Sequence, residues 1–230
     1  MKHIAAAFLL LLFFQSTQAQ TYEIGGLLGG ANYIGEIGPT TYINPNTPAF
    51  GALFRWNRSP RHSFRFTAMY ASLKSDDANS NETRRIQRDY SFKNSVKELG
   101  IGMEFTFWEF NTHLSQPQNS PYLYTGIAYF NYESLFLGHN NKMQKYGNDW
   151  ALAIPMVVGY KMTVGRYMVL GFEVGARYTF TDNIDGSNPT GDLDANTNLK
   201  FGNINSNDWY VFTGINLTVM FGRKPCFCVF

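Results

Sequence analysis

Apolar and polar residues alternate along most of this chain, in segments of about eight to sixteen residues. Stretches rich in Gly, Pro, Asn, Asp and Ser separate the segments. Successive side chains of a strand point to opposite faces, so each segment predicts a β-strand with one apolar face. The pattern predicts eight strands, over residues 22–34, 50–57, 63–74, 96–110, 122–132, 149–164, 167–181 and 209–222.

The two faces are clearest in the segment 149–164. Large apolar side chains occupy every second position from Trp150 to Tyr160, and smaller or polar ones lie between them. Pro155 lies in this segment and has no N–H for a ladder hydrogen bond, so we expect a β-bulge there.

A soluble sandwich and a membrane barrel both give this alternation. Three features favour the barrel. Most segments reach the nine or more residues, roughly, of a tilted membrane strand. The face opposite the apolar one mixes glycine with charges, and aromatic residues gather near segment ends, as an interfacial girdle requires. These aromatic residues are Trp56, Tyr70, Trp108, Trp150, Tyr160 and Trp209.

The connections alternate in length. Those after the second, fourth and sixth segments are short or moderate, and those after the first, third, fifth and seventh are long and polar. Outer-membrane barrels have short periplasmic turns and long extracellular loops. The sequence therefore predicts an all-β fold, an eight-stranded antiparallel transmembrane β-barrel with both termini in the periplasm.

The interior of such a barrel is narrow, and buried charges there need partners. The near balance of the expected inward charges favours an ion-pair network that fills the lumen over a proton or solute path, which is the alternative. The residues expected in this network are Arg55, Arg65, Glu98, Glu104, Lys161, Glu173 and Arg177.

The N-terminal residues 1–19 predict a signal peptide, which leaves residues 20–230 as the barrel domain. Lys2 provides a basic start, an apolar run follows, and Thr17 to Ala19 forms a small-x-small cleavage site. The apolar run has about eleven residues, so a retained membrane helix is the weaker alternative.

Composition and motifs exclude several classes of function. A formal charge of +2 over 230 residues is too small for a protein that neutralises nucleic-acid phosphates. No zinc spacing or phosphate-binding loop is present, so no cofactor is expected. A rim enzyme would have to use His139 with Ser134, Glu133 or Asp149, whose spacing is not diagnostic, and we expect no enzyme.

Four aspartates between residues 182 and 196 could supply oxygen ligands for a calcium ion. The stretch lacks the terminal Glu and the regular spacing of a calcium-binding loop, so the interpretation here is a solvated loop. These residues are Asp182, Asp185, Asp192 and Asp194.

Cys226 and Cys228 lie within the last five residues. A disulfide between residues two apart would be strained, and the periplasm is oxidising. A mutual or idle pair, an intermolecular bridge to a partner and a metal site all remain open.

The segment from Tyr22 to Glu36 (YEIGGLLGGANYIGE) resembles the PorG family, outer-membrane barrels of the type IX secretion system of Bacteroidota. Residues 57–65 (NRSPRHSFR) and 104–111 (EFTFWEFN) carry further similarity. The resemblance implies a non-enzymatic component in the outer-membrane lipid bilayer that anchors a periplasmic ring of PorK- and PorN-like proteins.

Under that resemblance, the periplasmic turns and the C-terminal tail would contact the ring, and a cysteine of the tail is a hypothetical tether. The expected contact residues are Arg58, Arg61, His62, His113, Arg166, Cys226 and Cys228. The alternative is a generic small barrel of the OmpA or OmpX kind, serving adhesion or envelope stability.

Overall fold

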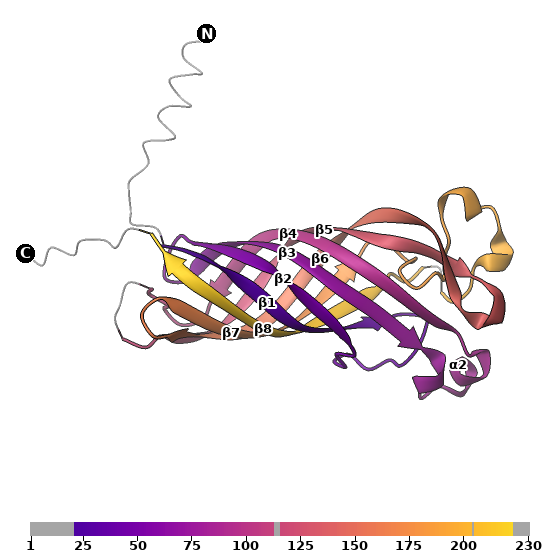
Figure 1. Cartoon of the computed structure of the whole chain (residues 1–230), viewed down its shortest axis with the longest axis horizontal. Helices are drawn as coiled ribbons and strands as arrows, with labels where there is room; N and C mark the ends of the chain where they lie inside the picture. The colour runs from indigo at the N-terminus through magenta and orange to yellow at the C-terminus, as the bar shows by residue number, and fades with distance from the viewer. Residues whose placement is uncertain (1–20, 113–115, 204, 223–230) are drawn as a thin grey trace, which may run out of the picture.

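Eight antiparallel strands close into one barrel in the computed structural model, which describes residues 21–112, 116–203 and 205–222. Each strand pairs with the next, and β8 pairs with β1 (Figure 1). The predicted all-β, eight-stranded barrel is confirmed. The strands are β1 Thr21–Ile34, β2 Thr47–Asn57, β3 His62–Asp76, β4 Ser91–Thr106, β5 Asn119–Leu137, β6 Met143–Val164, β7 Met168–Thr179 and β8 Trp209–Phe221.

Closure gives every strand two hydrogen-bonded neighbours and leaves no exposed sheet edge. The β1–β8 seam is tight where Gly29 lies opposite Gly214. A Cβ atom on Gly29 would lie 2.6 Å from the Cα of Gly214, and one on Gly214 would lie 2.8 Å from the Cα of Gly29. Glycine at both positions lets the first and last strands approach closely.

The alternation of the sequence separates the inside of the barrel from the outside. On β6, Trp150, Leu152 and Val158 are 52%, 47% and 61% exposed, whereas the intervening Ala153 and Val157 are buried. The same two-residue period runs through the other strands.

The two ends of the barrel differ. The connections 58–61, 107–118 and 165–167 lie at the end where β1 begins and β8 ends (left in Figure 1). The longer loops 35–46, 77–90 and 180–208 lie at the opposite end, with the short 3₁₀ and α-helical turns they contain. These turns are η1 Asp77–Asn79, α2 Thr83–Arg88, η3 Gly191–Leu193 and η4 Thr197–Leu199.

The expectation of a long loop after the fifth strand was wrong. Strands β5 and β6 continue as a hairpin to Leu137 and Met143, so that only residues 138–142, with η2 His139–Asn141, connect them. Polar residues such as Glu133 and Lys145 pair across this hairpin, 2.8 Å apart, which is why composition alone identified the stretch as a loop.

The expected bulge at Pro155 was also wrong. The register of β5 against β6 is the same at Thr125–Met156 and at Ala128–Ala153, so the proline interrupts ladder pairing without inserting a residue. The register shifts instead at Ser134 and Leu135.

None of the helices among the described residues is long and apolar enough to cross a membrane.

Candidate functional site

Arg55 is the centre of a buried ion-pair network inside the barrel. It points inward from β2, and its guanidinium lies 2.9 Å from Glu23 on β1 and 2.9 Å from Glu104 on β4. The second oxygen of Glu104 accepts a hydrogen bond from Lys161 of β6 at 2.7 Å. Asn216 of β8 accepts a further bond from Arg55 at 3.1 Å. Five strands are thus joined through one arginine and its partners.

Arg65 and Glu173 form a second ion pair inside the barrel. Both terminal nitrogens of Arg65 donate to the two oxygens of Glu173, each at 2.9 Å, which is the bidentate geometry that makes such pairs strong. Tyr122 and Asn216 donate to Glu173 at 2.6 and 3.1 Å. Asn216 therefore links this pair to Arg55.

Arg177 and Glu98 form a third pair, with Nε to Oε2 at 3.3 Å. Tyr210 donates its hydroxyl to the same oxygen of Glu98, and Arg177 donates to the carbonyl of Gly175 at 2.7 Å. Arg177 also lies over the rings of Tyr210 and Phe212. This pair is held by aromatic side chains rather than by further charges.

The structure places all seven charged residues expected in the lumen inside the barrel and gives each an opposite charge. Their exposure lies between 0% and 3%. A water-filled path past these side chains would leave them accessible, so the lumen is closed at their level.

Sequence reasoning missed Glu23. It is fully buried and is the fourth anion, so that the carboxylates balance the four cations Arg55, Arg65, Lys161 and Arg177. Its position was detectable, because Ile24 and Leu28 alternate with it as outward apolar residues. The uncharged members Tyr122, Tyr210 and Asn216 had no such signal, since their types also occur on outer faces.

Four of the expected contact residues lie at the end with the short turns. Arg58 and Arg61 belong to the β2–β3 turn, His62 begins β3, and Arg166 belongs to the β6–β7 turn; all four are exposed. Arg61 also donates to the carbonyl of Phe107 at 2.9 Å. The other three, His113, Cys226 and Cys228, lie outside the described residues, as does the predicted signal peptide.

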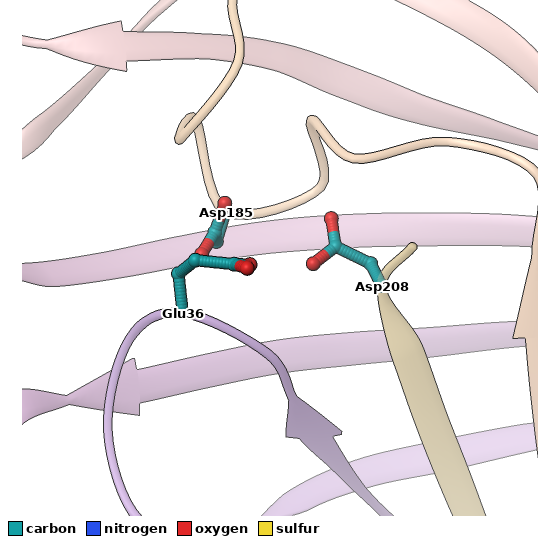
Figure 2. A group of neighbouring side chains, drawn as sticks. All are labelled: Glu36, Asp185 and Asp208. Carbon is teal, nitrogen blue, oxygen red and sulfur yellow. The ribbon is translucent and has the colours of Figure 1, made fainter. Parts of the chain in front are cut away.

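Three carboxylates meet at the opposite end of the barrel. Glu36 follows β1, Asp185 lies in the loop 180–208, and Asp208 immediately precedes β8; the three side chains point toward one another (Figure 2). One oxygen from each lies within 4.8 Å of the others. Asp185 and Asp208 are fully buried.

Burial and mutual repulsion perturb the carboxyl groups of this end. Burial, followed by the charge of Glu36, raises the pKa of Asp182 to about 7 and that of Asp185 to about 6. Burial, followed by the charge of Asp185, raises the pKa of Asp208 well above its usual range. The expectation of a solvated loop is therefore wrong for Asp182 and Asp185, although Asp192 and Asp194 are exposed.

The residues considered for a rim enzyme are not assembled. His139 is exposed, Ser134 is buried, and Glu133 pairs with Lys145. Asp149 accepts from the backbone N–H of Trp150. Among the described residues, no hydrogen bond joins the side chain of His139 to any of the three.

The family model described as Domain of unknown function (DUF6089) matches residues 2–230, nearly the whole chain. The chain belongs to this family. No curated protein is significantly similar to it in sequence.

Several solved structures resemble the DUF6089 barrel at low identity. The N-terminal β-barrel domain of Pseudomonas aeruginosa OprF is 8% identical, with a TM-score of 0.45, and the alignment covers 89% of this chain and 98% of that one. A major outer membrane protein from Thermus thermophilus is 10% identical, with a TM-score of 0.45, covering 89% and 100%. Neisserial surface protein A is 10% identical, with a TM-score of 0.44, covering 88% and 97%. Likenesses this distant carry no argument about function.

Proposed function

We propose that the DUF6089 barrel spans the outer membrane as a non-conducting, non-enzymatic anchor for an ordered layer of extracellular loops. The function would be the one expected of small OmpA- or OmpX-like barrels, adhesion or envelope stability. The support comes from the outer surface, the lumen and the loops.

The outer surface carries an apolar band with polar boundaries. On β6 the exposed apolar positions run from Trp150 to Tyr160, which is about the 9–11 residues of a tilted membrane strand. Lys97 and Asn131 face outward and pair across β4 and β5, just beyond the outermost apolar residues of those strands. Exposed apolar surface of this extent is unusual in a water-soluble protein and typical of a lipid-facing barrel.

The closed lumen is the observation that carries the proposal. The balanced ion pairs around Arg55, Arg65 and Arg177 occupy the cross-section and are inaccessible to water. An eight-stranded barrel has an interior that side chains just fill. The barrel body then serves to hold its ends in place rather than to pass solutes.

The loops at the far end pack together rather than extending separately. Arg88 of α2 pairs with Asp77 at 2.8 Å, donates to the carbonyl of Glu36 at 2.7 Å and lies over the rings of Tyr90 and Phe201. One side chain thus joins the loops after β1, β3 and β7. An ordered surface of this kind suits a contact role outside the cell.

The test of the proposal is single-channel recording with the refolded mature chain in planar bilayers, with a general porin as the positive control. We expect no conductance steps for this chain. Regular steps would contradict a closed lumen. Replacement of the loop segment 191–199 by a short Gly/Ser linker is then expected to impair adhesion or detergent resistance of the bacterium while the barrel still inserts.

The type IX secretion role is the second candidate, and the basic end with the short turns favours it. Arg58, Arg61, His62 and Arg166 would face the periplasm. The three arginines outnumber the one exposed acid paired there, Glu109 at 3.8 Å from Arg61, and would offer a contact surface to a ring of PorK- and PorN-like proteins. In this role Cys226 or Cys228 would form an intermolecular disulfide with a ring component.

A detergent pull-down of the tagged barrel from its own envelope, run with and without reductant, tests this role. Recovery of ring proteins that is lost in the Arg58→Glu, Arg166→Glu double variant would support it. Arg84→Glu is the matched control, because Arg84 is an exposed arginine at the opposite end. Recovery of the barrel alone would leave the first proposal standing and refute the second.

A further inference from the structure

The acidic cluster of Glu36, Asp185 and Asp208 lacks the positive partners that the lumen carboxylates have. Every inward carboxylate of the barrel lies within an ion pair, for example Glu104 with Arg55. No Lys or Arg of the described residues lies within ion-pair distance of the three carboxylates of the cluster.

Two arginines of α2 reach the backbone beside Glu36 but do not pair with its carboxylate. Arg85 of α2 donates to the carbonyls of Gly35 and Gly38, each at 2.9 Å. Arg88 binds Asp77 and the carbonyl of Glu36, not its carboxylate. These two arginines therefore donate to backbone carbonyls and do not compensate the negative charge of the three carboxylates.

An unpartnered oxygen gives an independent indication of a missing ligand. Asp185 is fully buried, and its Oδ1 accepts from the backbone N–H of Ser187 at 2.8 Å, whereas its Oδ2 has no hydrogen-bond donor. The carboxyl group that bears this oxygen points into the cluster (Figure 2). A buried acceptor without a donor is strongly unfavourable unless something positive reaches it.

Three of the four carboxylate oxygens of Glu36 and Asp208 accept hydrogen bonds. Tyr33 donates its hydroxyl to Oδ1 of Asp208, and the backbone N–H of Ile184 donates to Oδ2 at 2.8 Å. Ser206 donates to Oε1 of Glu36 at 2.7 Å. The carboxylates are thus oriented toward one another although they repel.

We propose that Glu36, Asp185 and Asp208 bind a divalent cation, Ca²⁺, which ties the loops after β1 and β7 to the start of β8. The geometry fits this ion. Three oxygens that are at most 4.8 Å apart can each lie about 2.8 Å or less from a central ion, and Ca–O distances are about 2.3–2.6 Å. Small side-chain rotations would close the difference, and hard carboxylate oxygens are the ligands that Ca²⁺ takes.

The proposed calcium site is argued only from residues at the loop end of the barrel, so it does not depend on which of the two proposed functions is right. It also explains why no sequence motif indicated it. Two of its ligands lie outside the stretch 182–196, and the two exposed aspartates of that stretch, Asp192 and Asp194, take no part.

Calorimetric titration of the EDTA-stripped, refolded mature chain with CaCl₂ at pH 7.5 tests the proposal. We expect one saturable site, with affinity in the range of extracellular modules, roughly 10⁻⁴–10⁻³ M. Asp185→Asn is expected to weaken binding at least tenfold. Asp192→Asn removes the same charge from an exposed position in the same loop and is expected to bind as the parent does. Mg²⁺ is expected to bind at least tenfold more weakly, because it requires a tighter octahedral shell.

A second measurement separates ion binding from simple loss of charge repulsion. In EDTA, Asp185→Asn is expected to slow proteolysis of the loop 180–208, because it removes repulsion; in Ca²⁺ the parent is expected to be the more resistant of the two. Should Asp185→Asn fail to fold, the partly exposed Glu36→Gln takes its place. The absence of saturable Ca²⁺ binding, equal affinity for Mg²⁺, or equal weakening by Asp192→Asn would overturn the proposal.

Discussion

Breaking the Arg65–Glu173 pair provides the sharpest test of the lumen network. Arg65→Met keeps most of the side-chain volume and removes both 2.9 Å bonds to Glu173. Among the described residues, Oε1 of Glu173 has no other hydrogen-bond donor, whereas Oε2 keeps Tyr122 and Asn216. The variant therefore leaves a buried, half-satisfied carboxylate.

Removing one partner of a buried pair typically costs about 3–5 kcal/mol. We expect Arg65→Met to lie in that range and Glu173→Gln somewhat lower, because glutamine still accepts from Tyr122. The double variant Arg65→Met, Glu173→Gln leaves no unpaired charge at this position. We expect its loss of unfolding free energy to be about 2 kcal/mol smaller than the sum of the losses of the two single variants. A coupling energy of this size is within the range for residues in direct contact.

The assay is equilibrium unfolding of the refolded barrel in guanidinium chloride with lipid vesicles, followed by tryptophan fluorescence. The Lys145–Glu133 pair provides the control cycle, because its side chains are 45% and 32% exposed and such pairs couple by about 0.2–1 kcal/mol. Additive single effects at Arg65 and Glu173, or coupling no larger than in the control, would refute the argument that buried charge compensation stabilises the barrel.

Further predictions concern the glycines, the acidic end and the interior tyrosine. Gly171→Val would place a Cβ 2.7 Å from the side-chain amide of Asn216, so we expect it to destabilise the barrel by about 1–3 kcal/mol in the same unfolding assay. A Cβ on Gly147 would meet no atom within 4 Å, so we expect Gly147→Ala to change the stability by less than about 0.5 kcal/mol. Without divalent cations, the loop 180–208 is expected to become more sensitive to protease as the pH rises from about 4 to 7. The reason is that Asp182 and Asp185 have folded pKa values of about 7 and about 6, above those of the unfolded chain. The stability that these carboxyl groups contribute is therefore present at low pH and is lost as they ionise in a buried site beside Glu36; a pH-independent cleavage rate would contradict this. Tyr122→Phe removes a 2.6 Å hydrogen bond to Glu173 but leaves no charge unpaired, so we expect the free energy of unfolding to fall by about 1.5–3 kcal/mol. A fall equal to that of Arg65→Met would show that the tyrosine hydrogen bond contributes as much to stability as the ion pair.

Some limits of sequence reasoning are visible in single residues. Alternation identified the inward side chains of Arg55 and Glu104, since each lies between outward positions on its strand. The same rule would have placed Glu23, which pairs with Arg55 across directly neighbouring positions of β1 and β2. The hairpin beyond Glu133 was missed because most side chains of its returning arm, residues 143–149, are polar. The two arms are nevertheless paired, with a register shift at Ser134 and Leu135.

The sequence by itself determined the number of strands, their faces and seven of the eight charges inside the barrel, because strand periodicity is local and a slip by one residue would turn every apolar side chain to the wrong face. Which charges meet was decided only by closure, which brings Glu23 near the start of the chain to Thr218 near its end at 2.7 Å. The acidic cluster depends on tertiary structure in the same way. Glu36 and Asp208 are brought together by pairing of β1 with β8, and the fold of the loop 180–208 brings Asp185 to them. Contacts between residues this far apart along the chain depend on the way the barrel closes, and no local pattern of residues encodes them.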